Sequence, residues 1–435
     1  MGTGPDDVGL SLVDLTDDSA PNIGANVAQM LEQQRDQVRA NLDWPAGGIE
    51  WGPNGPSYKK PPRKSARNLE RILSLDPEFR SRIRLNEHAN VVEYDGRPLE
   101  DADVTALRLE IADVYNGVEF GANAVQELVV YQAGRQAFHP VRDYLEGLRW
   151  DKTPRIDTML VDYARCADNE VNRVISRRFM ISAVARVMQP GAKVDTVLIL
   201  AGPQGYGKST FFKTLAGDDW FRDDTLDLRN KDATMQLRGA WLYELAELAS
   251  TRVRDAETVK AFISRPSDHF RPPYGRNVIE QKRQCVFVGT TNEPSFLNDP
   301  TGARRFWPAE VLGQIKTVEL ARNRDQLWAE AVAAYRARER WWLDLNEDRA
   351  LAEAQEQYQH EDPWLPKVAR WLDQPDTPSD GFTIETILNG AIQKDDDRQT
   401  KADEMRLGGI LTSLGYVKRR AMVDQVRSYR WFKRE

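Results

Sequence analysis

Three short apolar runs in the middle of the chain have the pattern of buried strands. They are residues 196–200, 240–245 and 285–289, and a fourth begins near residue 306. Strands that are covered on both faces read as continuous apolar runs, whereas half-exposed strands alternate. The first run leads through a glycine-rich loop into a helical pattern over 209–215. The pattern therefore predicts an α/β fold for the middle of the chain.

The residues before this core predict two further parts. Residues 1–65 are rich in Gly, Pro, Asp and Asn, which favours a flexible arm without a core and with one helix near 26–41. Residues 66–150 predict a small, mainly helical domain. Its expected elements are helices over 68–75, 101–115 and 123–133 and a strand near 89–94.

The remaining residues complete the predicted organisation. We assign 151–315 to the α/β core, which opens with two amphipathic helices over 151–190, and 316–365 to a helical linker. Residues 366–435 predict two helices and then two short basic strands, the shape of a winged helix. The second helix ends at Gly415, and its core residues would be Ile410, Leu411 and Leu414.

The glycine-rich loop predicts a nucleotide site. Its sequence, GPQGYGKS, fits the pattern G-x-x-x-x-G-K-S, and its backbone N–H groups and the following helix N-terminus would point at phosphates. Lys208 would reach the β- and γ-phosphates, and the Ser209 hydroxyl would ligate magnesium. The flanking strand and helix argue against a purely structural turn. We therefore expect ATP and Mg²⁺ as cofactors, held by Gly202, Pro203, Gln204, Gly205, Tyr206, Gly207, Lys208, Ser209 and Thr210.

Polar residues at the ends of the next apolar runs are candidates for hydrolysis. We expect Glu244 to bind Mg²⁺ through water and Glu247 to activate the attacking water, although these roles could be swapped. Asn292 follows the third run, where ligands of open α/β sheets bind, and could hold that water or the γ-phosphate. Arg304 and Arg305 are candidates to stabilise transition-state charge, and in a ring of subunits one of them could reach the neighbour's nucleotide. The alternative is an ordinary ion pair.

Composition and cysteine usage exclude several classes of protein. Charged residues make up 29% of the 435 residues, the mean hydropathy is -0.60, and no apolar run approaches the length of a membrane span. The N-terminus is acidic, unlike a signal peptide, so we expect a cytoplasmic protein without a membrane partner. Cys166, Cys285 and four scattered histidines form no C-x-x-C pair or cluster, which argues against a disulfide scaffold or a zinc site.

Two basic segments stand out against a net charge of -7. Residues 59–84 hold nine Lys or Arg against three acids, and residues 418–434 hold seven against one. Both could contact a phosphate backbone, although the first could equally be a solvated face. In the second, the candidates for duplex DNA are Lys418, Arg419, Arg420 and Arg427. The alternative for the winged helix is packing between subunits.

These motifs resemble the virulence-associated protein E family. Besides the loop and the two glutamates, the resemblance rests on HPVRDYLEGLRWDKTPRID (139–157), ETVKAFISRPSDHFRPPYGR (257–276), TTNEP (290–294) and GARRFWP (302–308). The family comprises P-loop proteins of phages and genomic islands, related to the superfamily 3 helicases of the AAA+ class. The similarity covers about 135–315. The spacing E-x-x-E departs from the adjacent Asp-Glu of many AAA+ proteins.

The resemblance implies a five-stranded AAA+ sheet, ATP hydrolysis, a hexameric ring and a role in replicating mobile-element DNA in a bacterial host cell. It also implies a loop over 258–277 that faces the ring pore and contacts single-stranded DNA. The matching positions are Lys260, Arg271, Tyr274 and Arg276. Cations with one aromatic ring suit backbone tracking and base stacking. No zinc ribbon or primase-like carboxylate pair is visible in the first 130 residues, so a primase is not predicted.

The sequence thus favours an ATP-driven, helicase-like motor or replication initiator. The alternative is an ATP-switched regulatory or oligomerisation module that does not translocate. A small-molecule kinase is disfavoured because no second substrate pocket or lid motif is visible and the DNA-contact candidates would have no use. Stimulation of ATP turnover by single-stranded DNA would separate the first two.

Overall fold

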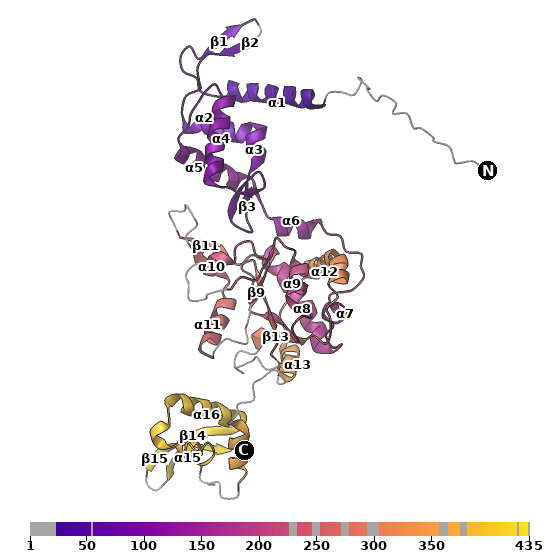
Figure 1. The fold of residues 1–435 in the computed structure, drawn as a ribbon, viewed down its shortest axis with the longest axis vertical. Coiled ribbons are helices and arrows are strands. Elements are labelled where there is room, and N and C mark those ends of the chain that lie inside the picture. Colours follow the sequence, from indigo (N-terminus) through magenta and orange to yellow (C-terminus); the bar gives the residue numbers. More distant parts are fainter. Residues whose placement is uncertain are drawn as a thin grey trace, which may run out of the picture.

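The computed structural model describes residues 23–53, 55–225, 233–245, 253–270, 278–293, 304–355, 364–374, 381–423 and 426–433. Along the sequence these residues form three parts, each with its own hydrophobic core (Figure 1). The middle part, which contains the predicted nucleotide site, is the largest.

The N-terminal part combines helices with a small sheet. Its helices are α1 (Ile23–Ala40), α2 (Ala66–Leu75), α3 (Pro77–Arg82), α4 (Asp101–Val114) and α5 (Ala122–Arg135). Its strands are β1 (Ile49–Gly52), β2 (Gly55–Tyr58), β3 (Ile83–Asn86), β4 (Val91–Tyr94), β5 (Arg97–Pro98) and β6 (Ala137–Phe138). β1 and β2 form an antiparallel hairpin, and the other four pair in the order β5-β4-β3-β6. The helices expected near 26–41, 68–75, 101–115 and 123–133 are all present.

The structure differs from the predicted arm at α1 and the turn after it. Val38 and Leu42 are buried in the same core as Leu69 and Phe79, which lie on α2 and α3. The glycines and prolines that suggested an arm lie between and around the short strands β1 and β2, whereas Val38 at the end of α1 packs inward. Residues 1–22 lie outside the described residues.

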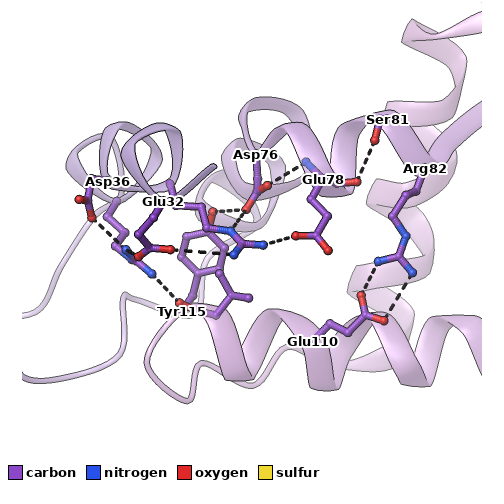
Figure 2. A network of polar contacts seen from close by, with 11 residues as sticks. Glu32, Asp36, Asp76, Glu78, Ser81, Arg82, Glu110 and Tyr115 are labelled. Atoms are coloured by element: carbon purple, nitrogen blue, oxygen red, sulfur yellow. Dashed lines mark hydrogen bonds and ion pairs between the residues drawn. The ribbon is translucent and has the colours of Figure 1, made fainter. Parts of the chain in front are cut away.

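A polar network attaches α1 to the rest of this part (Figure 2). Asp76 is fully buried and accepts hydrogen bonds from the Tyr115 hydroxyl (2.9 Å) and the Arg35 Nε (3.3 Å). Its other oxygen caps α3 by accepting from the Glu78 backbone N–H at 3.0 Å. Arg39 pairs with carboxylates of its own helix and donates to the Val114 carbonyl at 3.1 Å. Residues far apart in sequence therefore meet around one buried carboxylate.

The middle part is built on a five-stranded parallel sheet. Its strands are β7 (Val197–Ala201), β8 (Phe221–Arg222), β9 (Leu242–Leu245), β12 (Val286–Thr291) and β13 (Phe306–Glu310), in the order β13-β7-β12-β9-β8. Each neighbouring pair is parallel. The buried strands agree with the continuous apolar runs of the sequence. β12 lies between the strand before the loop and the strand that ends near Glu244.

Helices cover both faces of this sheet. One face packs on α6 (Pro140–Gly147), α7 (Met159–Asp162), α8 (Glu170–Met188), α9 (Lys208–Ala216), α12 (Thr317–Arg336) and α13 (Leu345–Gln355). The opposite face packs on α11 (Val253–Ile263), with α10 (Ala233–Gln236) and the small hairpin of β10 (Ser267–Phe270) and β11 (Ile279–Lys282) nearby in sequence. Leu198 and Leu200 point to the first face and Val197 and Ile199 to the second, as the alternation of a strand requires.

Two predicted boundaries differ from this arrangement. Val141 and Leu145 on α6 are buried in the core of the middle part, although residues 66–150 were expected to form a separate domain. Leu320 and Trp328 on α12 are buried in that core too, so α12 is not a linker. Both helices are amphipathic, and periodicity alone does not show which sheet an apolar face will cover.

The C-terminal part has the two predicted helices followed by two strands, and a further helix, α14 (Leu365–Leu372), that was not predicted comes before them. It contains α14, α15 (Ile384–Gly390), a short 3₁₀ helix η4 (Asp396–Arg398) and α16 (Lys401–Ser413), followed by the antiparallel strands β14 (Tyr416–Val423) and β15 (Val426–Lys433). Ile410 and Leu411 are buried in its core with Trp431, and Leu414 is partly buried. Gly415 ends the second helix with a φ of 83°.

A polar joint connects the N-terminal and middle parts. The side-chain oxygen of Gln284 contacts ring nitrogens of both His88 (3.3 Å) and His139, and the two rings lie 5.2 Å apart. Arg238 donates to the backbone carbonyls of Ala89 (2.8 Å) and Asn90. Gln284 precedes β12 and Arg238 precedes β9, so the joint lies at the beginning of two strands of the parallel sheet.

We expect Asp76→Ala to destabilise the N-terminal part by about 3 kcal/mol. The substitution leaves Tyr115 and Arg35 without their shared acceptor inside the core, and it removes the cap of α3. Hydrogen exchange of amides in α2 and α5 would measure the change. Glu110→Ala, which removes a half-exposed partner of Arg82, is the control and should cost less than about 1 kcal/mol. Equal loss of protection in both variants would contradict the prediction.

The joint should weaken in acid. Burial, with a smaller contribution from the neighbouring His139, lowers the pKa of His88 from 6.5 to about 4. Between these values the unfolded chain binds the proton more readily than the folded one, so the free energy of unfolding falls as pH drops from about 6.5 towards 4. Thermal unfolding across this window should show the loss, and His88→Gln should reduce it. An identical pH dependence in both proteins would contradict this assignment.

Candidate nucleotide site

The loop between β7 and α9 depends on glycine at positions that other residues cannot occupy. Gly202 has a φ of 155°, and a Cβ there would lie 2.8 Å from the Val311 carbonyl oxygen. Gly207 has a φ of 87° and is the N-cap of α9. Because this left-handed backbone favours glycine, the loop can turn directly from the strand into the helix. The N-terminus of α9 then begins at the loop, as a phosphate site requires.

The Lys208 side chain connects the loop to the end of β12. It is 7% exposed, and its Nζ donates to the carbonyls of Gly202 (2.7 Å) and Pro203 (2.8 Å) and to Oδ1 of Asn292 (2.8 Å). Burial lowers the pKa of Lys208, and the charge of Glu244 opposes this shift. The structure thus places Asn292 beside the loop, where the sequence analysis expected it.

Glu244 lies on β9, which pairs with β12 on the side opposite to β7. It is 3% exposed, and its Oε1 accepts hydrogen bonds from the hydroxyls of Ser209 (2.9 Å) and Thr290 (2.5 Å). Its Oε2 is buried and has no hydrogen-bond partner among the described residues. Burial raises the pKa of Glu244, and the two hydroxyl groups oppose that shift. One oxygen is therefore saturated while the other remains able to accept.

The pairing of Ser209 and Glu244 fits a magnesium ion that arrives with a nucleotide. Mg²⁺ prefers oxygen ligands and usually keeps several waters, with one or two protein groups and substrate phosphates. Within the described residues no group of three or more His, Cys, Asp or Glu could hold a metal. The protein alone thus offers part of a coordination shell, in which Ser209 Oγ and the Glu244 carboxylate would take part.

Thr290 is a site residue that the sequence analysis did not select. It is the last but one residue of β12, two residues before Asn292, and its hydroxyl fixes Oε1 of Glu244. The signal was present in the run of three polar residues, Thr-Thr-Asn, that follows the apolar strand. What the sequence could not show is that β12 would pair with β9 and so bring Thr290 next to Glu244.

The arginine pair and Lys260 lie away from the loop contacts. Arg305 donates from Nε to the Ser264 hydroxyl at 3.2 Å, just beyond α11, and Arg304 is exposed. Lys260 is only 9% exposed on α11, so its side chain does not stand on an open surface as a DNA contact would. Among the described residues, neither arginine forms a hydrogen bond or ion pair with Lys208 or Glu244.

Four candidate residues cannot be placed. They lie outside the described residues and are Glu247, Arg271, Tyr274 and Arg276. The assignment of Glu247 as the water-activating base and of the 258–277 loop as a DNA contact thus remains a prediction.

The basic strands of the C-terminal part present an aromatic ring flanked by cations. The Lys418 Nζ and the Arg420 guanidinium each lie 5.0 Å from the centre of the Tyr429 ring, which is 52% exposed. Arg419 is exposed on the same strand, and the side chain of Arg427 lies outside those described. Lys418 and Arg420 thus share one face of this hairpin, whereas Arg419 lies between them on the opposite face.

The site and the sheet define a P-loop NTPase. The model of the virulence-associated protein E-like domain matches residues 145–360. The chain therefore contains this P-loop NTPase domain, which is found in replication proteins of phages and genomic islands. The resemblance inferred from the motifs is confirmed.

Comparison with solved structures gives weaker likenesses. "The apo structure of NrS-1 C terminal region (305-718)" matches with a TM-score of 0.44 at 12% identity, covering 81% of this chain and 96% of that one. "The A form apo structure of NrS-1 C terminal region-CTR(305-718)" gives 0.35 at 16% identity, covering 63% and 66%. Scores below 0.5 do not establish a shared fold. A search of curated proteins gives no match. Within the described residues, no helix is long and apolar enough to cross a membrane.

Thr290→Val should lower kcat for nucleotide hydrolysis roughly tenfold and raise the Mg²⁺ concentration needed for half-maximal rate. The valine keeps the shape but removes the hydroxyl that holds Glu244, and a hydrogen bond to a charged group is worth about 1.5–3 kcal/mol. Nucleotide binding without Mg²⁺ should not change. Thr290→Ser retains the hydroxyl and should restore the rate. If the serine variant is as slow as the valine variant, Thr290 acts through packing instead.

Proposed function

We propose that this chain is a Mg²⁺-dependent ATPase that drives a helicase-like motor or replication initiator on mobile-element DNA. The observation that carries the proposal is the meeting of three strand ends at the loop, where Lys208 contacts Asn292 and Ser209 contacts Glu244. A loop alone binds nucleotide, whereas hydrolysis also needs a carboxylate and a polar group near the γ-phosphate. In this proposal Glu244 is the carboxylate and Asn292 is the polar group.

Each residue has a distinct part in this proposal. The backbone N–H groups of the loop bind phosphates, and Lys208 exchanges its carbonyl contacts for phosphate oxygens. Thr290 holds Oε1 of Glu244, and Oε2, which has no hydrogen-bond partner among the described residues, is left to accept from a ligand. Bound magnesium would neutralise charge that develops on the phosphates. Asn292 orients the attacking water or the γ-phosphate, and Glu247, by its spacing, accepts the proton from that water.

The sheet order supports an assignment to the AAA+ class, with superfamily 3 helicases as the relatives. The strand before Asn292 lies between the strand before the loop and the strand carrying Glu244. In this proposal, Asn292 lies between the phosphates and the acid of β9. The five parallel strands are also the number that the family resemblance implies.

A ring of subunits, with six as the number implied by the family, is part of the proposal. The exposed side chain of Arg304 is available to a neighbouring subunit, and a guanidinium suits the planar, charged transition state of phosphoryl transfer. Arg305 is less suited because it already contacts Ser264 within its own chain.

DNA is the proposed partner, and the cytoplasm of a bacterial host is the proposed location. The C-terminal part supports duplex contacts because two helices precede a hairpin that presents Lys418, Arg419 and Arg420, as in a winged helix. The runner-up function is a switch that changes oligomer or partner with ATP and does not translocate. The pairing of a hydrolytic site with a basic hairpin favours the motor.

The wild-type chain should hydrolyse ATP with Mg²⁺, turn over faster with single-stranded DNA, and displace a paired strand. Lys208→Ala should abolish turnover, whereas Lys213→Ala, on the exposed side of the same helix, should retain it. If ATP turnover does not respond to DNA and no strand is displaced, the ATP-dependent switch is the better assignment. A chain that stays monomeric in ATP and still hydrolyses it would exclude the ring.

A further inference from the structure

The β1–β2 hairpin exposes an aromatic face that has no core to cover it. In the antiparallel register Ile49 pairs with Tyr58 and Trp51 pairs with Pro56, so these four side chains share one face. Trp51 is 79% exposed. Figure 1 shows the hairpin at the end of the N-terminal part, beyond α1 and α2. A large exposed aromatic side chain on a projecting hairpin suggests a binding surface.

The base of the hairpin is held firmly. The ring of Tyr58 stacks on that of Trp44 at 4.7 Å with an interplanar angle of 26°, and the Arg39 guanidinium lies 5.7 Å from the Tyr58 ring. The Trp44 indole N–H donates to the Arg39 carbonyl at 2.9 Å. Two strands alone are marginally stable in water, and these contacts anchor them to α1. Trp51 therefore lies on a hairpin whose base is fixed to the rest of the N-terminal part.

A strip of positive charge follows the hairpin. Residues 44–67 hold one acid, Glu50, and it is paired with Lys59 at 3.6 Å. Lys60 and Arg63 donate to the backbone carbonyls of Ala46 and Trp44, so these contacts leave their charges unneutralised. The cations of the strip are Lys59, Lys60, Arg63, Lys64 and Arg67, all in exposed residues.

The end of the strip coincides with the start of α2. Lys64 and Arg67 flank Ser65, the N-cap of this helix, and its first turn contains no acidic residue. A helix N-terminus favours anions, so the helix and the two cationic side chains both favour binding of an anion. Although the chain has a net charge of -7, this strip would attract a polyanion locally.

We propose that the β1–β2 hairpin and this strip form a binding site for single-stranded nucleic acid. A base stacks on Trp51, and the phosphates that follow contact the strip. Stacking needs an unpaired base, because the bases of a duplex already stack on one another. The proposal rests on the nucleic-acid partner proposed above but not on ATP turnover, and it adds a site separate from residues 258–277 and from β14–β15.

The test is fluorescence anisotropy of the full chain with labelled oligothymidylate and oligouridylate, without ATP and over a salt series. Trp51→Ala should weaken binding roughly tenfold at every salt concentration, since it removes a stacking partner. Trp51→Phe should retain most of the affinity. Lys64→Gln and Arg67→Gln should each lower the salt slope by ~0.7. Comparing the two probes shows whether the site prefers DNA or RNA.

Two matched controls separate this site from general effects. Trp342→Ala removes another exposed indole, 56% exposed beyond α12, and Lys193→Gln removes an exposed lysine of the middle part. Both should bind like the wild type. ATP turnover without nucleic acid should be unchanged in the Trp51 variants.

Two results with the Trp51→Ala chain would overturn the proposal. The first is that Trp51→Ala binds single strands with the affinity of the wild type. The second is that it loses as much affinity for duplex as for single strands. A Trp51→Ala chain with unchanged affinity but a smaller assembly size would assign the hairpin to a protein contact. If the wild type binds no single strand at all, the nucleic-acid partner of the proposed function fails as well.

Discussion

The arrangement of the site depends on one buried carboxylate. Glu244 lies at the end of a buried strand, where desolvation favours its neutral form, and hydroxyl groups from two other elements compensate in part. Ser209 comes from the loop helix and Thr290 from the neighbouring strand. Because one oxygen satisfies both donors, the other remains for a ligand. The loop, β9 and β12 therefore have to be correctly placed together for Ser209, Thr290 and Glu244 to make these contacts.

Much of this fold follows from local pattern. The strands before the loop and before Asn292 are continuous apolar runs, and GPQGYGKS has no common alternative in a strand–loop–helix context. Asn292 was located correctly because a polar residue after a buried strand has to appear at the carboxyl edge of the sheet. Pairing between strands is different, since it depends on contacts far apart in sequence. Thr290 was missed for that reason: its role exists only when β12 lies against β9.

The differences in the flanking parts have a similar cause. Glycine and proline around β1 and β2 suggested an arm, but Val38 and Leu42 find partners on helices that come later in the chain. α12 looked like a linker because its periodicity does not identify the face that it covers, yet Trp328 is fully buried against the sheet. Lys260 matched a family position for DNA contact and is buried on α11. Local patterns indicate that a surface is apolar or charged; the tertiary neighbours decide what it meets.

The polar joint has a mechanical consequence. Gln284 and Arg238 precede β12 and β9, and the opposite ends of these strands hold Asn292 and Glu244. A six-residue strand such as β12 spans about 20 Å of stiff, hydrogen-bonded backbone. A force on the N-terminal part is therefore transmitted along the backbone of these two strands to Asn292 and Glu244. Displacement of the N-terminal part at the joint therefore acts on the beginnings of the two strands whose other ends hold the site.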